Sequence, residues 1–290
     1  MNIAFLTLEN PEGFVIYDSL CIPEFQKLNI KLIELPWTME CNWSQFDMVI
    51  IRSTWDYQKH WKKFIEVLKI IENQTLLANS LKAVLWNVNK KYLKELKNVG
   101  FSIVNSYFIE GNLSETLFLK LKTLWNSKKL VIKPQISANA DNTFVLEFYE
   151  NYSILSHHFK ETPCIIQPYL KEIETFGEIS LFYFDGLYSH AVRKMPKNGD
   201  FRVQEEHGGL IYGFEPNQTL KSIGSLIVNY LDSKFGDLLF VRIDLVRHHR
   251  KWKIMEIELI EPSLYFPYHD KAIDNFVKAT VSWYKKRASR

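Results

Sequence analysis

Hydrophobic and polar residues alternate singly between residues 240 and 259, a pattern typical of β-strands whose two faces meet different surroundings. The pattern predicts a hairpin of two strands. One face would carry the charged residues Arg242, Asp244, Glu256 and Glu258. The other face would be apolar and would consist of Val241, Ile243, Leu245, Met255, Ile257 and Leu259.

The register of this hairpin decides which charges meet. A five-residue loop at 248–252 would place Asp244 opposite Glu256 and Arg242 opposite Glu258. Opposed carboxylates repel by on the order of 4 kcal/mol at about 4 Å and an effective dielectric near 20, so we expect a cation between them. Three carboxylates without regularly spaced His or Cys suit Mg²⁺ bridging nucleotide phosphates. The alternative is a solvated face on which Arg242 and Glu258 only pair.

The N-terminal part of the chain alternates segments of strand and helix length. This alternation predicts an open, mostly parallel sheet covered by helices, and ligands of such sheets bind beyond the carboxyl ends of the strands. The predicted strands cover 3–8, 31–35, 48–53 and 76–78. One predicted helix ends near residue 28, and another spans about 59–72.

A polar and aromatic cluster follows the strand at 48–53, where the crevice of this sheet would be. Arg52 could hold an anionic substrate through two hydrogen bonds, and Asp56 could hold an amine or orient Arg52. The alternative is a helix N-terminus that short polar side chains cap. Its position favours a substrate role for the cluster Arg52, Ser53, Thr54, Asp56 and Tyr57.

Two lysines lie where they could contact phosphates. Lys90 falls in the first turn of a helix capped by Asn89, where the helix dipole disfavours a cation. Lys133 lies on an apolar strand before the polar loop 135–143 and a further strand. This loop could close over phosphates, and its Asn and Asp residues replace glycine in left-handed backbone.

A strand at 164–170 is interrupted by a proline. Where hydrogen-bond donation stops, backbone groups become available to an adenine edge, and a carboxylate just beyond can accept ribose hydroxyls. The flanking segments 113–125 and 151–159 have helical patterns. The predicted nucleotide contacts are Gln167, Pro168, Tyr169, Leu170, Glu172 and Glu174.

The dipeptide Asp185-Gly186 separates two strand-like segments and indicates a two-residue type I′ hairpin. This turn would place Glu178 opposite Arg193. The charged segment after the hairpin ends in two glycines, which allow close backbone approach. Cationic groups gathered here would complement a triphosphate. The cationic residues are Arg193, Lys194 and Arg202, and the two glycines, Gly208 and Gly209, are predicted to contact the substrate.

The composition is that of a soluble globular protein, with 47% hydrophobic and 24% charged residues among 290. The net charge of +3 does not favour a nucleic-acid partner. The three cysteines are too scattered for a disulfide framework, and the first strand lacks a basic leader. We therefore predict a cytoplasmic protein with no membrane partner. Its oligomeric state stays open, a homodimer included.

Taken in order, these motifs resemble the ATP-grasp superfamily of carboxylate-amine ligases over nearly the whole chain. The resemblance rests on Asn89-Lys90, Lys133-Pro134, residues 166–170, residues 200–209, Arg242-Ile243-Asp244 and Glu256-Ile257-Glu258. Residues 52–57, 200–209 and 256–264 are most similar to the branch that contains the cycloserine-forming O-ureido-serine cyclo-ligase.

The resemblance implies an α/β (α+β) ATP-grasp fold in three subdomains, an N-terminal substrate domain (1–85), a central lid domain (86–170) and a C-terminal domain (171–290) with the metal and phosphate site. It implies ATP and Mg²⁺ as cofactors. Phosphates would contact Lys90 and Lys133, and Arg202 with Arg193 would act in catalysis. The metal ligands would be Asp244, Glu256 and Glu258, with Glu178 and Arg242 beside the nucleotide.

The implied function is an ATP-dependent ligase that phosphorylates a carboxyl or carbonyl oxygen of an amino-acid-like substrate, so that an amine can displace phosphate. Two alternatives remain open. One is intramolecular ring closure of the cycloserine type, and the other is an ATP-binding module without ligase activity. A nucleic-acid binder is a more distant third.

Overall fold

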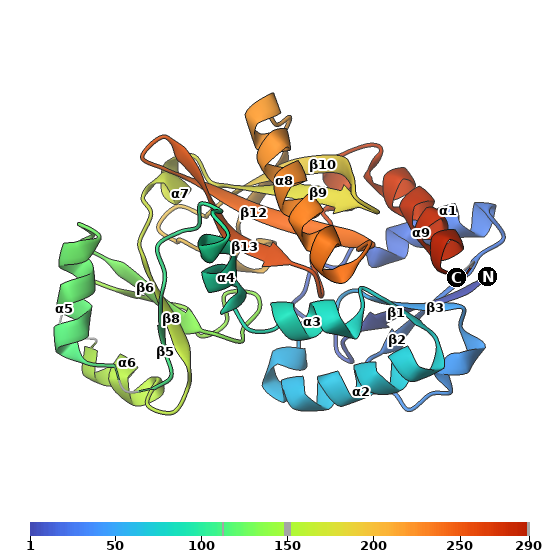
Figure 1. Ribbon diagram of the computed structural model, residues 1–290, viewed down its shortest axis with the longest axis horizontal. Coiled ribbons are helices and arrows are strands. Elements are labelled where there is room, and N and C mark those ends of the chain that lie inside the picture. The colour runs from blue at the N-terminus through green and yellow to red at the C-terminus, as the bar shows by residue number, and fades with distance from the viewer. Residues whose placement is uncertain (112, 148–151, 289–290) are drawn as a thin grey trace.

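The computed structural model describes residues 1–111, 113–147 and 152–288. Within them the strands form three sheets (Figure 1). The first sheet is parallel with the order β2-β1-β3-β4, which confirms the prediction for the N-terminal part. Its strands are β1 (Asn2–Thr7), β2 (Lys31–Pro36), β3 (Met48–Ile51) and β4 (Leu76–Ala78).

Single-residue alternation along β1 explains why helices cover both faces of this sheet. Ile3 and Phe5 pack with Phe25 of α1 (Ile22–Lys27). Ala4 and Leu6 pack on the other face with α2 (Trp61–Gln74), through Phe64, Ile65, Leu68 and Ile71.

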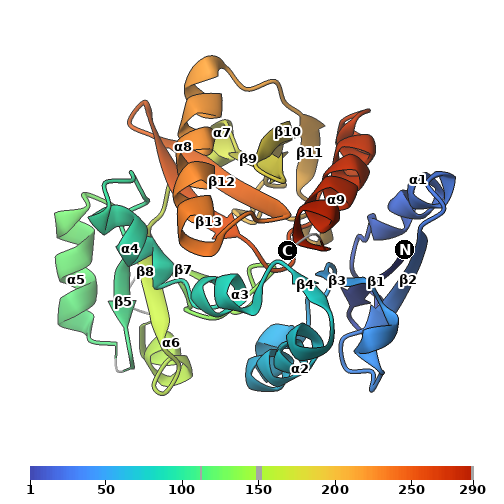
Figure 2. The same cartoon turned by 45° about the vertical axis from the view of Figure 1, so that its right-hand side comes forward.

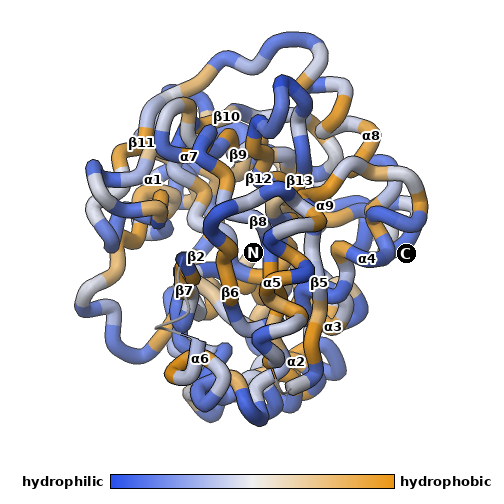
Figure 3. Tube along the Cα trace, turned by 90° about the vertical axis from the view of Figure 1, so that its left-hand side faces the viewer, coloured by the Kyte–Doolittle hydropathy of each residue, from blue (hydrophilic) through white to orange (hydrophobic). Residues whose placement is uncertain are grey.

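The second sheet is antiparallel with the order β5-β8-β6-β7, and α5 and α6 contribute to its core. In Figure 3, which faces this lobe, hydrophobic segments of β5 and β6 lie between hydrophilic loops. Residue 151, the predicted start of the second helix, lies outside the described residues. The elements are β5 (Tyr107–Ile109), α5 (Glu115–Leu124), β6 (Leu130–Pro134), β7 (Phe144–Leu146), α6 (Tyr152–His158) and β8 (Cys164–Pro168).

The third sheet is antiparallel with the order β11-β10-β9-β12-β13. Apolar residues on one face of it pack against α3, α4 and α8. The short helix α7 (Glu172–Thr175) follows β8 and contacts β12. The other elements are α3 (Leu81–Asn87), α4 (Tyr92–Asn98), β9 (Glu178–Phe184), β10 (Leu187–Met195), β11 (Leu210–Gly213), α8 (Gln218–Phe235), β12 (Phe240–His248) and β13 (Lys251–Glu258).

The β12–β13 hairpin has the predicted pairing but a different turn. Asp244 lies opposite Glu256 and Arg242 opposite Glu258, as expected. The loop is shorter than predicted, because His248 already pairs with Lys251. An irregularity between Ile254 and Glu256 shifts the pairing by one residue, so that Asp244 still lies opposite Glu256. It also turns Met255 away from the apolar face predicted for it, to pack against a small cluster beside the cleft.

The β9–β10 hairpin corrects a second prediction. Leu187 pairs with Phe184 around the expected two-residue turn, but a bulge between Tyr188 and His190 shifts the register by one residue. Lys194, and not Arg193, therefore lies opposite Glu178.

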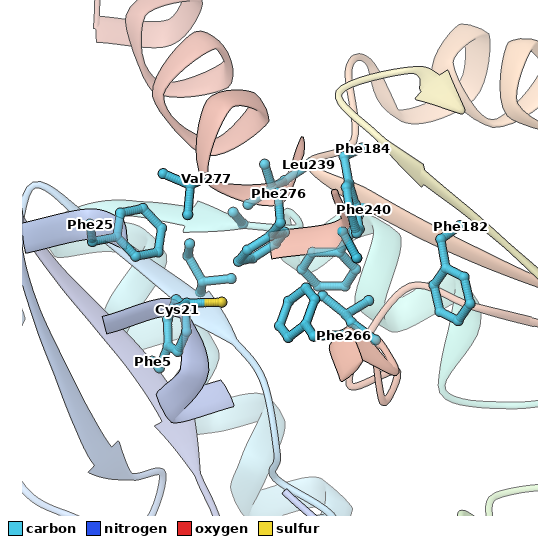
Figure 4. Packing of buried hydrophobic residues seen from close by; sticks show 14 of the residues in the cluster. Phe5, Cys21, Phe25, Phe182, Phe184, Leu239, Phe240, Phe266, Phe276 and Val277 are labelled. Atoms are coloured by element: carbon cyan, nitrogen blue, oxygen red, sulfur yellow. The ribbon is translucent and has the colours of Figure 1, made fainter. Parts of the chain in front are cut away.

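The helix α9 (Ala272–Ala288) connects the first and third sheets. It contacts α1, β9 and β10, and Figures 1 and 2 show it between these elements. Phe276 packs edge-on against Phe5 of β1 and Phe184 of β9 (Figure 4). The C-terminal helix thus belongs to the core that joins the two sheets.

The three sheets fall within the three predicted domain ranges. The helix α4, however, packs on the third sheet although it lies in the range 86–170. The boundaries after residues 85 and 170 remain a prediction. None of the helices in the described part of the chain has the length and hydrophobicity needed to span a bilayer.

Candidate active site

A cleft is lined by residues of the second and third sheets and of connecting segments, including the one that follows β3 of the first sheet. Its free volume, including the mouth open to solvent, is about 1500 Å³. Trp55 and Tyr57 follow β3, Lys133 lies on β6, and Asp244 and Glu256 lie on β12 and β13. Residues separated by about 200 positions in the sequence thus face one space.

Four carboxylates line the cleft on neighbouring strands: Glu178, Asp244, Glu256 and Glu258. Asp244 is buried and accepts a hydrogen bond of 2.6 Å from the Ser180 hydroxyl. Its opposite partner on β13 is Glu256. The predicted crowding of acidic groups is therefore present on one face.

Side-chain cations lie between these carboxylates. Nζ of Lys90 is 2.9 Å from Glu256, and Nζ of Lys194 is 3.3 Å from Asp244 and also pairs with Glu178. Arg242 pairs with Asp244 at 3.0 Å and with Glu258. The cationic neutralisation expected from the sequence is thus supplied by the chain itself.

Burial and the ion pairs together set the pKa values of the carboxylates. Burial alone would raise the pKa of Asp244 and Glu256, but neighbouring cations outweigh it and lower both values. Burial raises the pKa of Glu178 despite Lys194, and it raises that of Glu258 despite Arg242. Burial also lowers the pKa of Lys133, against the attraction of Glu256.

Lys90 is held in place by its neighbours along the chain. The Asn87 side chain donates to the carbonyl of Ile257 and accepts from the backbone N–H of Leu259, which satisfies the free edge of β13. The Tyr92 hydroxyl donates to the same Ile257 carbonyl at 3.0 Å. The turn between α3 and α4 is thereby fixed against β13, and its lysine faces Glu256.

The loop 135–143 lines the cleft through Ser137, Ala138, Asn139, Ala140 and Thr143. Asn139 and Asn142 adopt the left-handed conformation that the sequence predicts for a loop without glycine, and Ala140 adopts it as well. Lys90 donates a hydrogen bond of 2.7 Å to the carbonyl of Ser137. The loop is therefore linked to a lysine at the acidic cluster.

The predicted adenine segment lines the cleft. Its four residues are Gln167, Pro168, Tyr169 and Leu170, together with apolar walls from Val131, Ile173 and Met255. Glu172 and Glu174, predicted for the ribose, lie outside the lining. Glu174 accepts a hydrogen bond from the Tyr169 hydroxyl, and Glu172 accepts one of 3.2 Å from the backbone N–H of His249.

Arg193, predicted to act in catalysis, points away from the cleft. Its guanidinium lies 5.5 Å from the ring centroid of Tyr212 and 5.9 Å from that of Phe176. The β-bulge in β10 gives the position opposite Glu178 to Lys194, and a bulge has no strong sequence signal. Lys194 is the cationic residue that the predicted register missed.

The substrate cluster predicted after β3 is only partly at the cleft. Arg52 is fully buried, pairs with Asp18 at 2.9 Å and donates to the carbonyl of Pro262, so it cross-links the chain internally. Ser53 and Thr54 are buried and lie outside the lining. Asp56 is half-buried, also lies outside the lining, and accepts a hydrogen bond from Trp37 Nε1. Tyr57 reaches the cleft, together with Trp55.

Arg202 lines the cleft and pairs with Asp200 at 2.7 Å, and its predicted role in catalysis stays a prediction. Gly208 and Gly209 lie outside the lining and shape the loop instead. Gly208 has φ +80°, and a Cβ on Gly209 would lie 2.2 Å from the Val203 carbonyl oxygen.

Several lining residues were given no role from the sequence, although they lie in segments on which the resemblance rests. Glu205 lines the cleft and accepts hydrogen bonds from Tyr17 and Tyr268, which ties the loop 200–209 to two other segments. Burial raises the pKa of Glu261 to about 8, and the charge of Glu258 adds to the effect. These residues follow no strand or helix period, so only the folded chain brings them together.

The fold of the chain is that of the ATP-grasp ligases, which confirms the fold that the resemblance implies. The structure of D-alanine–D-alanine ligase from Bacillus anthracis in complex with ATP superposes with a TM-score of 0.68 at 14% identity, over 99% of both chains. The ATP-grasp ligase PsnB in complex with a minimal precursor gives 0.66 at 14% identity, covering 97% of this chain and 98% of PsnB.

The particular similarity is to a cycloserine-forming enzyme. Residues 3–79 match the family model of the N-terminal domain of D-cycloserine synthetase DcsG. The cycloserine biosynthesis protein DcsG of Streptomyces lavendulae is 25% identical over 257 residues, 82% of this chain and 83% of DcsG. The crystal structure of D-cycloserine synthetase DcsG has a TM-score of 0.85 at 21% identity, covering 98% of this chain and 100% of that one.

Proposed function

We propose that this chain is an ATP- and Mg²⁺-dependent ligase that phosphorylates a carboxyl or carbonyl oxygen of an amino-acid-like substrate. ADP leaves, an amine attacks the activated carbon, and the C–O bond to phosphate breaks as the C–N bond forms. The observation that supports this most is the meeting of Asp244 and Glu256 with three cations, Lys90, Lys194 and Arg242, in one cleft of an ATP-grasp fold.

The donor set of the cleft fits a hard divalent ion. Among the described residues that line it there is no histidine or cysteine, and Asp244, Glu256 and Glu258 offer carboxylate oxygens. These three residues would hold Mg²⁺. When bound, Mg²⁺ would neutralise charge on the phosphoryl group being transferred.

The remaining roles are proposed from the resemblance, and the residues concerned all line the cleft. Lys90 and Lys133 would contact phosphates, and residues 167–170 would contact the adenine. Arg202 would stabilise the acyl phosphate. No side-chain nucleophile is required, since placement and charge neutralisation supply most of the rate in phosphoryl transfer. Binding of an anionic nucleotide would compete with the carboxylates for Lys90 and Lys194.

A second candidate is intramolecular ring closure, in which the attacking amine belongs to the activated substrate. It is favoured by the similarity to the protein named D-cycloserine synthetase. Either reaction would use a small-molecule substrate. We further propose that the chain consists of three domains, with bounds 1–85, 86–170 and 171–290. A homodimer is a further proposal.

The test is to measure ADP release with Mg²⁺ and ATP over a panel of amino acids and their ureido and hydroxylamine derivatives. We expect at least one compound to stimulate ADP release, and the product mass then separates ring closure from joining of two substrates. ATP binding without stimulated ADP release by any compound would favour an ATP-binding module.

A further inference from the structure

A group of two histidines and a glutamate lies outside the cleft, at the turn between β12 and β13. Ligand atoms of Glu172, His248 and His249 all lie within 4.8 Å of one another. Glu172 is the first residue of α7, and Figure 1 shows α7 beside the tip of this hairpin. The group thus joins two segments separated by more than 70 residues.

One pair of ligand atoms in this group has nearly the separation found between two ligands of a metal ion. Nδ1 of His248 lies 3.5 Å from Oε1 of Glu172, and this buried nitrogen has no hydrogen-bond partner in the described part of the chain. Two ligands bound tetrahedrally to Zn²⁺ at 2.0–2.1 Å lie about 3.3 Å apart. The backbone N–H of His249 donates to the same Oε1 at 3.2 Å, which orients the carboxylate.

The chemistry of the donors selects the class of metal. Mg²⁺ and Ca²⁺ require several oxygen ligands, whereas two imidazoles and one carboxylate are a common zinc set with the fourth position left to water. Basic residues surround the turn, namely Arg247, Arg250, Lys251 and Lys253. Their charges oppose the binding of any cation, so imidazole coordination would have to supply most of the affinity.

We propose that Glu172, His248 and His249 form a Zn²⁺-type site that ties α7 to the β12–β13 turn. The next residue of α7, Ile173, lines the cleft beside the predicted adenine segment. A metal here would fix the connection between the second and third sheets and stabilise the protein without taking part in the reaction.

The test uses the untagged full chain, stripped of metal and titrated with Co²⁺ and then with Zn²⁺. We expect one equivalent of Co²⁺ to give the intense visible absorption of a tetrahedral site, Zn²⁺ to displace it, and Zn²⁺ to raise the Tm. The variant His248→Ala/His249→Ala should lose the absorption and the Tm shift. Glu172→Gln should weaken Zn²⁺ binding more than about tenfold.

The matched control is His157→Ala/His158→Ala, which removes two consecutive exposed histidines at the end of α6. It should bind Co²⁺ like the wild type. Wild-type protein that binds no more Co²⁺ than the His248→Ala/His249→Ala variant would overturn the proposal, and this comparison does not depend on ligase activity. Circular dichroism of each variant confirms that it is folded.

Discussion

Lys194 lies directly opposite Glu178 across the β9–β10 ladder and pairs with both Glu178 and Asp244. Both carboxylates are buried, and the attraction of Asp244 and Glu178 raises the pKa of Lys194 even though burial opposes this. The charge of Lys194 is therefore part of the structure of the acidic cluster.

Replacement of Lys194 by methionine should lower the free energy of unfolding by about 3–5 kcal/mol, because it leaves buried carboxylates without a partner. The measurement is urea unfolding at neutral pH. The control is Arg193→Met, the next residue along β10, which points away from the cleft and should cost less than about 1 kcal/mol. Equal losses in the two variants would contradict the assigned register.

Glu256→Gln should reduce Mg²⁺-dependent ADP release at least about tenfold, because a neutral amide is a poor ligand for a hard cation. Stability should change less, since the substitution also removes the repulsion with Asp244. The rate is measured against Mg²⁺ concentration. Glu215→Gln, at an exposed ion pair with Lys221, is the control. Unchanged turnover in Glu256→Gln would remove the metal-ligand assignment.

Arg52→Met should destabilise the protein by about 3–5 kcal/mol, because it leaves the Asp18 carboxylate buried and unpaired. Thermal unfolding measures this effect. Below the Tm, the variant should keep the substrate KM of the wild type, since Arg52 does not line the cleft. A stable variant with a raised KM would restore the substrate role predicted from the sequence.

The stability of the protein should depend on Glu261 between about pH 4.5 and 8. Burial raises the pKa of Glu261 from 4.5 to about 8, so the folded state binds the proton more tightly than the unfolded state. Its contribution is full below about pH 4.5 and is lost as the pH rises to about 8, on the order of a few kcal/mol.

Urea unfolding across this pH range should show a flatter profile for Glu261→Gln than for the wild type. Glu66→Gln, at an exposed pair with Lys69, should retain the wild-type profile. Parallel profiles for wild type and Glu261→Gln would show that Glu261 is not protonated in the folded protein.

Much of the site could be predicted from the sequence where strand alternation applies. A period of two fixes which side chains share a face, so Arg242, Asp244 and Glu258 were placed together before the structure was known. The pairing of Asp244 with Glu256 was predicted with a longer loop, and the shorter turn and the irregularity in β13 compensate each other.

The sequence by itself determined the order of strands and helices, the acidic face of the hairpin and the ATP-grasp resemblance. These depend on local periodicity and on the order of motifs along the chain. Only the tertiary structure decided that Lys194, and not Arg193, lies opposite Glu178, and that Arg52 pairs with Asp18. A one-residue bulge costs little local free energy. The partner of a buried charge can come from a segment that is distant in the sequence. Packing of the whole chain therefore selects both, and no local pattern specifies them.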